Sequence, residues 1–441
     1  MRRPRPRAEV IFLGIGLLAG IAFALLTPPL KGADERDHWL RAFQISQGGW
    51  RAVRRGNEVG GWLPRAAQEV DATATPAATA SDEPAGELVF VDFRRTAVFA
   101  PVAYAPQALA IRIATALRLP AEYVLYAARL AGLAASLWLA YAAIRITPIG
   151  ARLFMLLALT PMAIRQMSAL SADSMANGFA LLFVALCVSV ALERDRPASH
   201  ARLAVLAGCS LVVSLAKIAY APLLPLVLIC PPARLGGRTR HAAIVGAIGV
   251  VNFAAVGLWL WASRDRYVAQ PIAPDADPAR QLAFILAEPL RFLHVLGATS
   301  RTHWQAYLGA ATGFAGSRGA PPAAAGWLYL AVAALVAGLD GRPDRALGWR
   351  AKCLLSGALV ATYVSIDALN YMGWNAVGAA SIGLVQGRYF LPLLAPAFLL
   401  LSNRRAAGLI EDRRLTICCG AAAGISAAVA LRYLVLRWYG V

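Results

Sequence analysis

Residues 202–230 read RLAVLAGCSLVVSLAKIAYAPLLPLVLIC, and this apolar stretch decides the topology of the chain. A helix that crosses a bilayer needs about 20 apolar residues. The stretch is longer than that, and Lys217 and Pro222 interrupt it. Its composition fits either one tilted helix or two short helices that meet near Lys217.

Charged residues on either side of this stretch favour two short helices. If the stretch is a hairpin and the N-terminus is cytoplasmic, the short cytoplasmic connections together hold 20 Lys and Arg residues. The first long loop on the other side is nearly neutral, with 9 basic and 10 acidic residues over positions 28–100. Membrane proteins show this excess of Lys and Arg in their cytoplasmic loops. The basic connections are 2–8, 145–152, 193–202, 231–241, 340–352 and 403–414.

The composition excludes a soluble protein and argues against nucleic-acid binding. Hydrophobic residues make up 59% of the 441 residues. Charged residues make up 15%, against about 25% in ordinary soluble domains. The net charge of +19 lies in residues that separate apolar segments, and the sequence contains no nucleic-acid-binding motif. The six cysteines lie within or beside apolar segments, so no disulfide framework or metal-binding pair is indicated.

We predict an all-α integral membrane protein, a single polytopic domain over residues 1–441 with about ten or eleven transmembrane helices. Segments 28–120 and 263–325 are predicted to be outer-face loops that contain short helices. Within the first loop, the semi-apolar segment 101–119 carries two arginines and is expected to lie in the interface, because a span there would invert the topology. The predicted spans are 9–27, 121–144, 151–165, 174–192, 202–216, 218–231, 242–262, 326–339, 351–368, 387–402 and 415–436.

The N-terminus combines a basic start, MRRPRPR, with an apolar run from Val10 to Leu26, as a signal peptide does. The run ends in Thr27-Pro28-Pro29, and no small-x-small cleavage site follows it. We therefore expect an uncleaved first helix with its N-terminus in the cytoplasm.

The stretch after this first helix, PPLKGADERDHWLRAFQISQGGW, is dense in ionisable residues. If it is helical, Asp34, His38 and Arg41 lie near one face, because their spacing is close to i, i+4 and i+7. A carboxylate such as Asp34 or Glu35 could act there as a general base toward a hydroxyl group, or bind a divalent cation. The alternative is a solvated turn at the membrane surface with ordinary salt bridges.

A second candidate motif, Gln386-Gly-Arg-Tyr-Phe390, opens a predicted helix at the outer face. A helix N-terminus and the guanidinium of Arg388 together could bind an anion, and arginine matches phosphate in a bidentate way. The alternative is that Arg388 extends from a helix end toward the headgroups, beside an interfacial Tyr389.

Further ionisable residues lie near the ends of predicted spans. Segment 161–174, PMAIRQMSALSADS, places Arg165 and Asp173 between two helices, where they either serve a site or form a polar turn. Lys217 lies at the tip of the predicted hairpin, and ionisable residues at membrane depth are often functional. Arg129, inside a predicted span, is expected to pair with an acid or reach the interface.

Several motifs together resemble one known family. They are PPxxGADExxHxxRAFQISQG at 28–48, YAPQALAI at 104–111, TPMAIRQMSALSADSMANG at 160–178, KIAYAPLL at 217–224 and QGRYFLPLLAP at 386–396. In this order they resemble the bacterial membrane-protein family called domain of unknown function 2142. That family is grouped with the GT-C superfamily of membrane glycosyltransferases, so the resemblance implies a GT-C-like helical fold.

The resemblance also implies roles for residues. Enzymes similar to GT-C move a sugar from a polyprenyl-phosphate carrier to an acceptor at the outer face, and an acidic residue in the first outer loop serves catalysis. Asp34 matches that position best and Glu35 next, while Arg388 and Lys217 match the basic residues that hold the phosphate. The supporting residues are expected to be His38, Arg41, Tyr104, Gln107, Arg165, Ser171, Asp173, Gln386 and Tyr389.

The expected function is therefore a glycosyltransferase of the bacterial inner membrane that acts on a cell-envelope glycan or lipid acceptor. Two alternatives stay open: a transporter or flippase of a lipid-linked glycan, and a non-catalytic membrane assembly protein. The sequence contains no GxxxxGK[ST], HExxH or GxSxG motif, so no nucleotide hydrolysis is indicated. The expected partners are a polyprenyl-phosphate-linked sugar and membrane lipids, no nucleic acid is expected, and no cofactor is certain, although a divalent cation is an open alternative.

Overall fold

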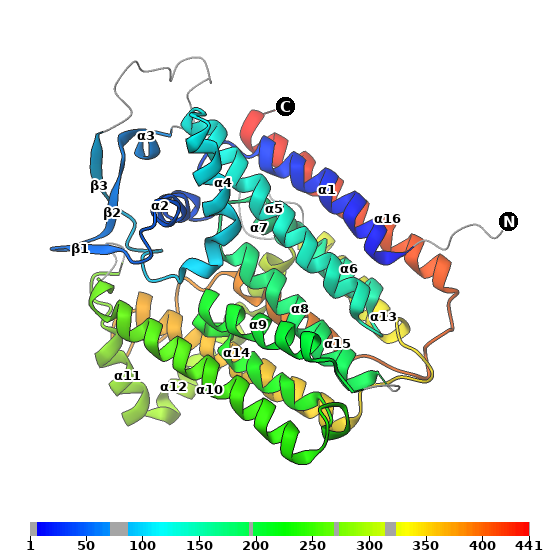
Figure 1. Cartoon of the computed structure of the whole chain (residues 1–441). Coiled ribbons are helices and arrows are strands. Elements are labelled where there is room, and N and C mark those ends of the chain that lie inside the picture. The colour runs from blue at the N-terminus through cyan, green and yellow to red at the C-terminus, as the bar shows by residue number, and fades with distance from the viewer. Residues whose placement is uncertain (1–6, 71–86, 194–196, 269–272, 314–322, 441) are drawn as a thin grey trace.

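The computed structural model describes residues 7–70, 87–193, 197–268, 273–313 and 323–440. It is an all-α membrane protein with one small sheet, as the composition predicted (Figure 1). Within the described residues, six helices are long and apolar enough to cross a membrane. They are α1 (Ala8–Leu26), α5 (Ala121–Ile146), α8 (Ala172–Leu192), α10 (Arg238–Ser263), α14 (Trp349–Trp374) and α16 (Asp412–Tyr439).

The 202–230 stretch forms two elements, as the charge pattern predicted. Helix α9 (His200–Ala216) ends at Lys217, and the 3₁₀ segment η2 (Ile218–Ile229) follows directly. Pro222 and Pro225 lie inside η2 and lack the N–H groups that an α-helix needs, which explains the 3₁₀ geometry. The two elements pack against each other as a hairpin.

Other predicted spans are interrupted. Segment 151–165 breaks into α6 (Ala151–Ala158) and α7 (Pro161–Ser168), because Thr160 adopts an extended conformation before Pro161 and caps the second helix. Segment 387–402 begins as the 3₁₀ turn η5 (Gly387–Phe390) and continues as α15 (Leu391–Leu399).

The segment predicted as the second outer loop contains two helices, α11 (Pro278–Ala287) and α12 (Pro289–Thr312). Together they are apolar enough to span, but they bend by 106° at their junction. The next helix, α13 (Ala323–Leu339), is apolar and short. The bend keeps α11 beside the end of α14 while α12 approaches η5.

The segment predicted as the first outer loop contains a sheet that the sequence did not predict. Strands β1 (Val53–Arg55), β2 (Glu58–Pro64) and β3 (Leu88–Asp92) form an antiparallel sheet in the order β1-β2-β3. Gly60 in β2 approaches the backbone of Val91 too closely for a side chain. The loop also contains α2 (Glu35–Ser46), α3 (Arg65–Gln68), the 3₁₀ turn η1 (Pro101–Tyr104) and α4 (Ala105–Ala116).

Helix α4 has the amphipathic character that the sequence indicated for segment 101–119. It has 12 residues, which is short of a span of about 20. Leu109, Arg112 and Ile113 are exposed, whereas Gln107 and Ile111 are buried against the bundle.

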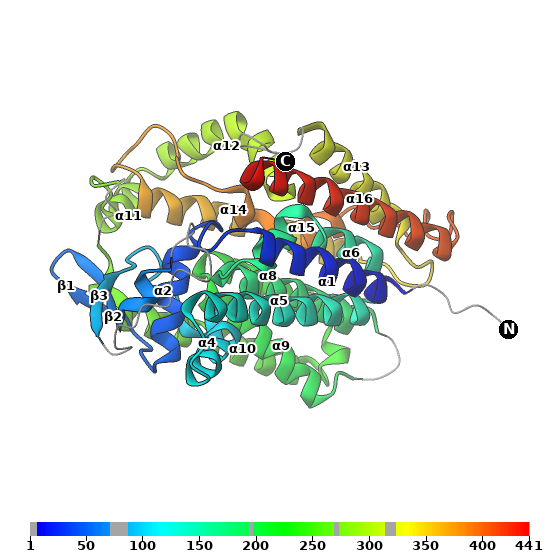
Figure 2. The same cartoon turned by 90° about the horizontal axis from the view of Figure 1, so that it is seen from above.

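The bundle has two distinct ends (Figure 1). The sheet, α2, α4 and α11 gather at one end, and the N-terminal end of α1 lies at the other. Basic connections meet at this second end, where Arg152 pairs with Asp340 and Asp412. The short 3₁₀ turns η3 (Pro232–Arg234) and η4 (Arg264–Arg266) flank α10. Figure 2, a view from above, shows α1 and α16 side by side along one flank, and the two helices are in contact.

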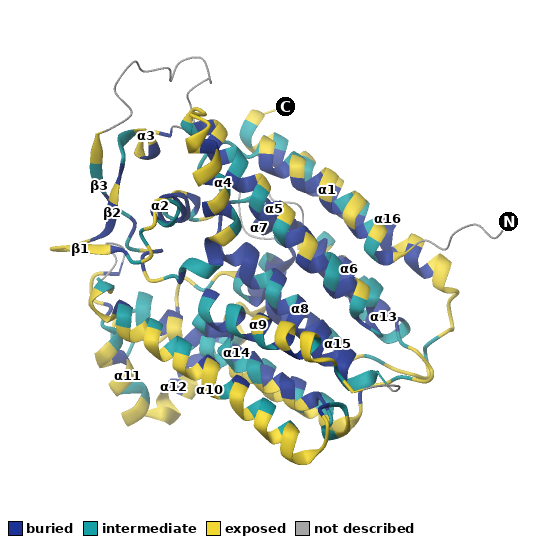
Figure 3. Ribbon diagram, viewed as in Figure 1, coloured by how far each residue is buried: buried dark blue, intermediate teal, exposed yellow. Residues whose placement is uncertain are grey.

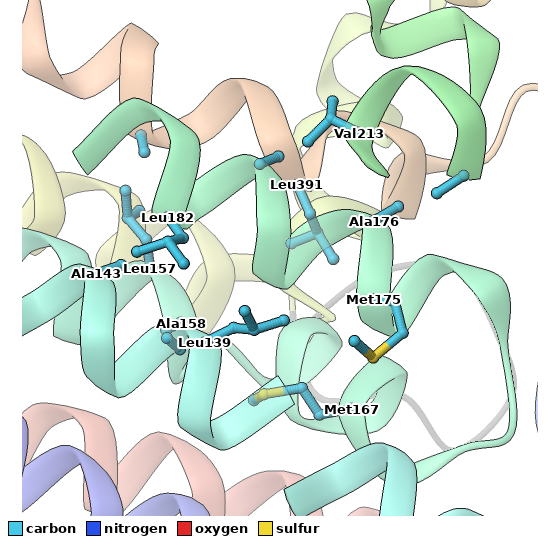
Figure 4. Packing of buried hydrophobic residues seen from close by; sticks show 14 of the residues in the cluster. Leu139, Ala143, Leu157, Ala158, Met167, Met175, Ala176, Leu182, Val213 and Leu391 are labelled. Atoms are coloured by element: carbon cyan, nitrogen blue, oxygen red, sulfur yellow. The ribbon is translucent and has the colours of Figure 1, made fainter. Parts of the chain in front are cut away.

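The core lies where α5, α6, α8 and α15 meet (Figures 3 and 4). Leu139 of α5 lies against Gly178 of α8, where an added Cβ would be 2.9 Å from the leucine side chain. Small residues allow helices in membranes to approach this closely. The exposed residues are concentrated on the outer helices such as α10 and α11 (Figure 3).

Candidate functional site

Asp34 has a backbone conformation that directs its carboxylate away from its own helix. It precedes α2 in the N-cap position with φ 55° and ψ 16°, the left-handed region, and it makes no capping hydrogen bond. An N-cap residue normally adopts an extended conformation and accepts from the helix. The Asp34 carboxylate instead forms an ion pair with Arg388, which also donates to the Ala33 carbonyl at 3.3 Å.

Arg388 reaches this position because η5 packs tightly on α12. An added Cβ at Gly387 would lie 2.6 Å from the Tyr307 carbonyl oxygen and 2.7 Å from the Ala311 nitrogen. Only glycine therefore permits this approach, and the next side chain, Arg388, is 4% exposed. Asp34 and Arg388, 354 positions apart in the sequence, therefore meet in one ion pair.

Two further charges extend this pair. The Lys217 Nζ atom lies 2.8 Å from Asp173 Oδ1, and the Arg388 Nε atom lies 3.5 Å from Asp173 Oδ2. Lys217 also lies 3.8 Å from the centre of the Tyr389 ring, a cation–π distance. Two carboxylates and two cations from four separate segments thus form one continuous cluster.

The cluster borders a cavity of about 340 Å³ at the end of the bundle that carries α2. Arg95, from the segment after the sheet, lies 3.9 Å from the second Asp34 oxygen. Aromatic residues from α10 and α14 contribute to the wall. The charged and imidazole side chains that line this cavity are Asp34, His38, Arg94, Arg95, Asp173, Lys217 and Arg388.

His38 lies one turn into α2 and is buried. Its Nδ1 atom forms a hydrogen bond of 2.7 Å with the Tyr104 hydroxyl group. The pKa of His38 is lowered to about 4 from an ordinary value of 6.5, mainly because the imidazole is buried; the negative charge of Asp173 opposes this change and the positive charge of Arg388 adds to it. The imidazole is therefore neutral at physiological pH. Burial also raises the pKa of Tyr104 well above its ordinary value.

Glu35 lies outside the cavity, although it follows Asp34 directly. Its carboxylate is fully buried and pairs with the fully buried Arg129 at 2.6 Å. It also accepts from the Leu170 nitrogen at 3.0 Å and the Gly32 nitrogen at 2.9 Å. These contacts use both oxygens to hold together α5 and the segments before α2 and α8, so this placement favours a structural role for Glu35.

Three of the predicted supporting residues also make structural contacts away from the cavity. Arg41 is fully buried and donates to the carbonyls of Trp50 and Phe99 at 2.9 and 3.2 Å. Gln107 donates to Ser174 at 3.2 Å, and Ser171 accepts from the Asp173 nitrogen at 3.1 Å as a helix cap.

Of the other predicted residues, Gln386 and Tyr389 line the cavity, and Arg165 lines a second cavity on the far side of Arg388. Arg94 and Arg95 also line the cavity, and neither was predicted from the sequence. Their adjacent charges in an otherwise apolar-rich segment, VFVDFRRTAVF, were the available signal.

The open alternative of a divalent cation finds little support in this donor set. Among the described residues, no three His, Cys, Asp or Glu side chains are close enough to hold a metal ion. The two carboxylates of the cluster, Asp34 and Asp173, already face Arg388 and Lys217. A cation would have to displace these partners, so these residues do not fit a divalent-cation site.

Comparisons with known proteins give a family. No curated protein and no solved structure matches the chain. Residues 17–397 match the family model described as "predicted membrane protein (DUF2142)", which is most of the chain and includes every member of the charged cluster. The chain therefore belongs to the DUF2142 family of predicted membrane proteins.

Proposed function

We propose that this membrane protein is a glycosyltransferase that moves a sugar from a polyprenyl-phosphate donor to a cell-envelope acceptor at the outer face of the bacterial inner membrane. One observation carries the proposal. A carboxylate that is partly accessible, Asp34, and a buried cation, Arg388, come from distant segments and meet beside a cavity at one end of a membrane bundle.

The two groups fit the two demands of glycosyl transfer. The Asp34 carboxylate accepts the proton of the acceptor hydroxyl, whose oxygen bonds to the anomeric carbon. The bond between that carbon and the phosphate oxygen breaks, and the polyprenyl phosphate leaves as an anion that Arg388 stabilises. A phosphate is a sufficient leaving group, so this reaction requires no nucleotide site.

The ion pair of Asp34 and Arg388 is compatible with this chemistry. A donor phosphate competes with Asp34 for the guanidinium, which is held in place by Asp173 and by the Ala33 carbonyl. The Asp34 side chain is 32% exposed, whereas that of Arg388 is 4% exposed. The carboxylate is therefore the partner that is free to turn toward an incoming hydroxyl group.

The distribution of charge supports an outer-face site. The basic connections expected in the cytoplasm include 340–352 and 403–414, and ion pairs of Arg152 link these regions at the end of the bundle opposite α2. The cavity then lies on the non-cytoplasmic side, where polyprenyl-linked sugars are delivered to envelope acceptors.

The test compares Asp34→Asn with Asp37→Asn in cells that lack the chromosomal copy. Asparagine keeps the shape of Asp34 and tolerates its left-handed backbone, so the protein should fold. Transfer should fall by about 10²- to 10⁴-fold in Asp34→Asn, measured as accumulated lipid-linked sugar and lost surface glycan. Asp37 lies outside the cavity of about 340 Å³ and faces Arg95, so Asp37→Asn should retain transfer.

Normal surface glycan in Asp34→Asn cells, at protein levels equal to those of the wild type, would show that Asp34 is not the general base. Equal glycan in wild-type and deletion cells, with lipid-linked sugar distributed abnormally between the two leaflets, would favour transport of the lipid-linked sugar instead.

A further inference from the structure

A second cavity of about 420 Å³ lies on the other side of Arg388. Helices α1, α7, α12 and α16 and the segment before η5 contribute its walls. Its described lining contains four cationic side chains and no Asp or Glu. The cationic residues are Lys31, Arg129, Arg165 and Arg388.

Two of these cations have no acidic partner among the described residues. Arg129 is balanced by Glu35, and Arg388 by Asp34 and Asp173. Arg165 and Lys31 take part in no ion pair or side-chain hydrogen bond in the described part of the chain. The cavity therefore has a net positive charge.

Arg165 is the more informative of the two cations, because it is not fully exposed. The other charged side chains on the wall of the same cavity are also cations. A cation in a partly apolar site beside other cations is unfavourable unless an anion is bound there. The arrangement is therefore typical of a binding site for an anionic group.

The lining also contains a buried polar atom without a hydrogen-bond partner among the described residues. Gln166 is 4% exposed, and its Oε1 atom accepts no hydrogen bond. A buried polar atom without a partner costs free energy, so it indicates a ligand or a bound water. The Gln166 side chain belongs to the wall of this cavity.

Much of the remaining lining is apolar, alongside polar side chains such as Thr27, Ser168 and His303. Phe23, Met162 and Leu434 contribute apolar surface from three helices, and Trp438 adds an indole ring. The same helices carry large exposed apolar side chains on their outer faces, which is where lipid chains pack in a membrane protein. These exposed residues include Leu25 on α1, Trp304 on α12 and Leu436 on α16.

We infer that this second cavity binds a phosphate group carried on an apolar chain, and that Arg165 and Arg388 bind the phosphate. Arginine suits this task, because its planar guanidinium can donate two hydrogen bonds to one phosphate. Lys31, exposed at the cavity, adds attraction for the anion. The apolar lining receives the first part of the chain.

This inference, which rests on the proposed function, assigns the donor phosphate to the second cavity and the acceptor to the first. Arg388 and Gln386 line both cavities, so a phosphate in the second cavity is adjacent to Asp34 and the acceptor in the first. Lys217 lines only the first cavity, where Asp173 neutralises it. Arg165, and not Lys217, is then the second phosphate-binding residue.

The test uses calorimetry to measure the binding of a long-chain polyprenyl phosphate to the purified full-length protein in detergent. Arg165→Gln should weaken binding by about tenfold or more. Since Arg165 has no described partner to lose, this variant should fold. Arg112→Gln, which removes an exposed arginine of α4 outside both cavities, should bind as the wild type does. Normal binding by Arg165→Gln together with lost binding by Lys217→Gln would overturn the assignment.

Three further ligands identify the chemistry. The polyprenol without phosphate and inorganic phosphate alone should each bind much more weakly than the polyprenyl phosphate, and equal binding of either one would overturn the inference. Phosphatidylglycerol as competitor distinguishes the source. Displacement of the polyprenyl phosphate assigns the cavity to the phosphates of bulk phospholipids, and failure to displace it assigns the cavity to a single-chain carrier.

The result of this experiment is independent of the test of the proposed function, because the lipid phosphate can bind without any sugar transfer. Asp34→Asn should bind the polyprenyl phosphate normally. If Arg165→Gln loses binding but neither the wild type nor any variant shows transfer activity, the phosphate site is supported and the proposed transferase function is rejected. If transfer depends on Asp34 but Arg165→Gln binds normally, the transferase function is supported and the phosphate site is rejected.

Discussion

Asp34 and Glu35 are adjacent carboxylates, each paired with an arginine from a distant segment, yet their environments differ completely. The pair of Glu35 and Arg129 is fully buried, and every carboxylate oxygen has a partner. Asp34 keeps 32% of its side chain exposed beside a cavity, with Arg388 behind it. One residue of separation thus distinguishes a fully buried ion pair from one that borders a cavity.

The difference arises from the backbone. Glu35 is the first residue of α2 and its side chain turns back to the end of α1, where Arg129 also binds the carbonyls of Ala24 and Thr27 at 2.8 and 2.7 Å. These carbonyls lie at the C-terminal end of α1 and lack helical partners, so the guanidinium satisfies them. Asp34, in the left-handed region, points the other way.

The largest expected effect is on stability and comes from Glu35→Gln. Removing this charge leaves Arg129 buried without a counterion, so the free energy of unfolding should fall by about 3–5 kcal/mol. Denaturant titration of the purified protein measures the loss. Asp34→Asn is the matched control and should cost about 1 kcal/mol or less, because Arg388 retains Asp173. Equal losses of unfolding free energy in the two variants would show that the Glu35 and Asp34 ion pairs do not differ in their contribution to stability.

A smaller effect is expected from Gly387→Ala, which tests the support behind Asp34. The added Cβ would meet backbone atoms of α12, at 2.6 Å from the Tyr307 carbonyl oxygen, and backbone yields less readily than side chains. We expect a loss of about 1–3 kcal/mol in unfolding free energy and weaker binding of the polyprenyl phosphate. Gly383→Ala is the control, because its nearest neighbour lies at 3.4 Å. Wild-type behaviour of Gly387→Ala would show that η5 is not held by this contact.

A third expected effect is a pH dependence on the Asp34 side of the pair. The native protein holds His38 neutral with a pKa of about 4, whereas an unfolded histidine titrates near 6.5. Between these values the unfolded state binds more protons, so stability is complete above pH 6.5 and falls as the pH decreases toward 4. The slope from this group is at most about 1.4 kcal/mol per pH unit. Unfolding measured from pH 4 to 8 should show a weaker dependence in His38→Gln; an unchanged dependence would assign it to other groups.

Much of the fold could be predicted, because apolar length and loop charge are local properties of the sequence. The hairpin at Lys217 and the amphipathic helix near Arg112 follow from them. The interruption at Thr160 was missed, although Pro161 signalled it. The sheet was missed because strands as short as β1 and β3 show too little alternation to be distinguished from loop.

The candidate site was predictable where motifs were dense and unpredictable where contacts are distant. The motifs singled out Asp34 and Arg388 separately, and the structure brings these residues, 354 positions apart, into one ion pair. The burial of Glu35 could not be predicted, because its partner Arg129 lies 94 positions away and spacing carries no information at that range. The left-handed conformation of Asp34 depends on the contacts around it and not on its neighbours in sequence.

Helix α16 lines the second cavity but lies outside the part of the chain that the family model matches. The family model ends at residue 397, whereas Leu434 and Trp438 of α16 form part of the cavity wall and α16 packs along α1. If the second cavity binds the chain of a lipid phosphate, as we infer, the preference for chain length or saturation is determined partly by a helix that the shared family pattern does not describe. Relatives with the same charged cluster could then differ in the lipid that they accept.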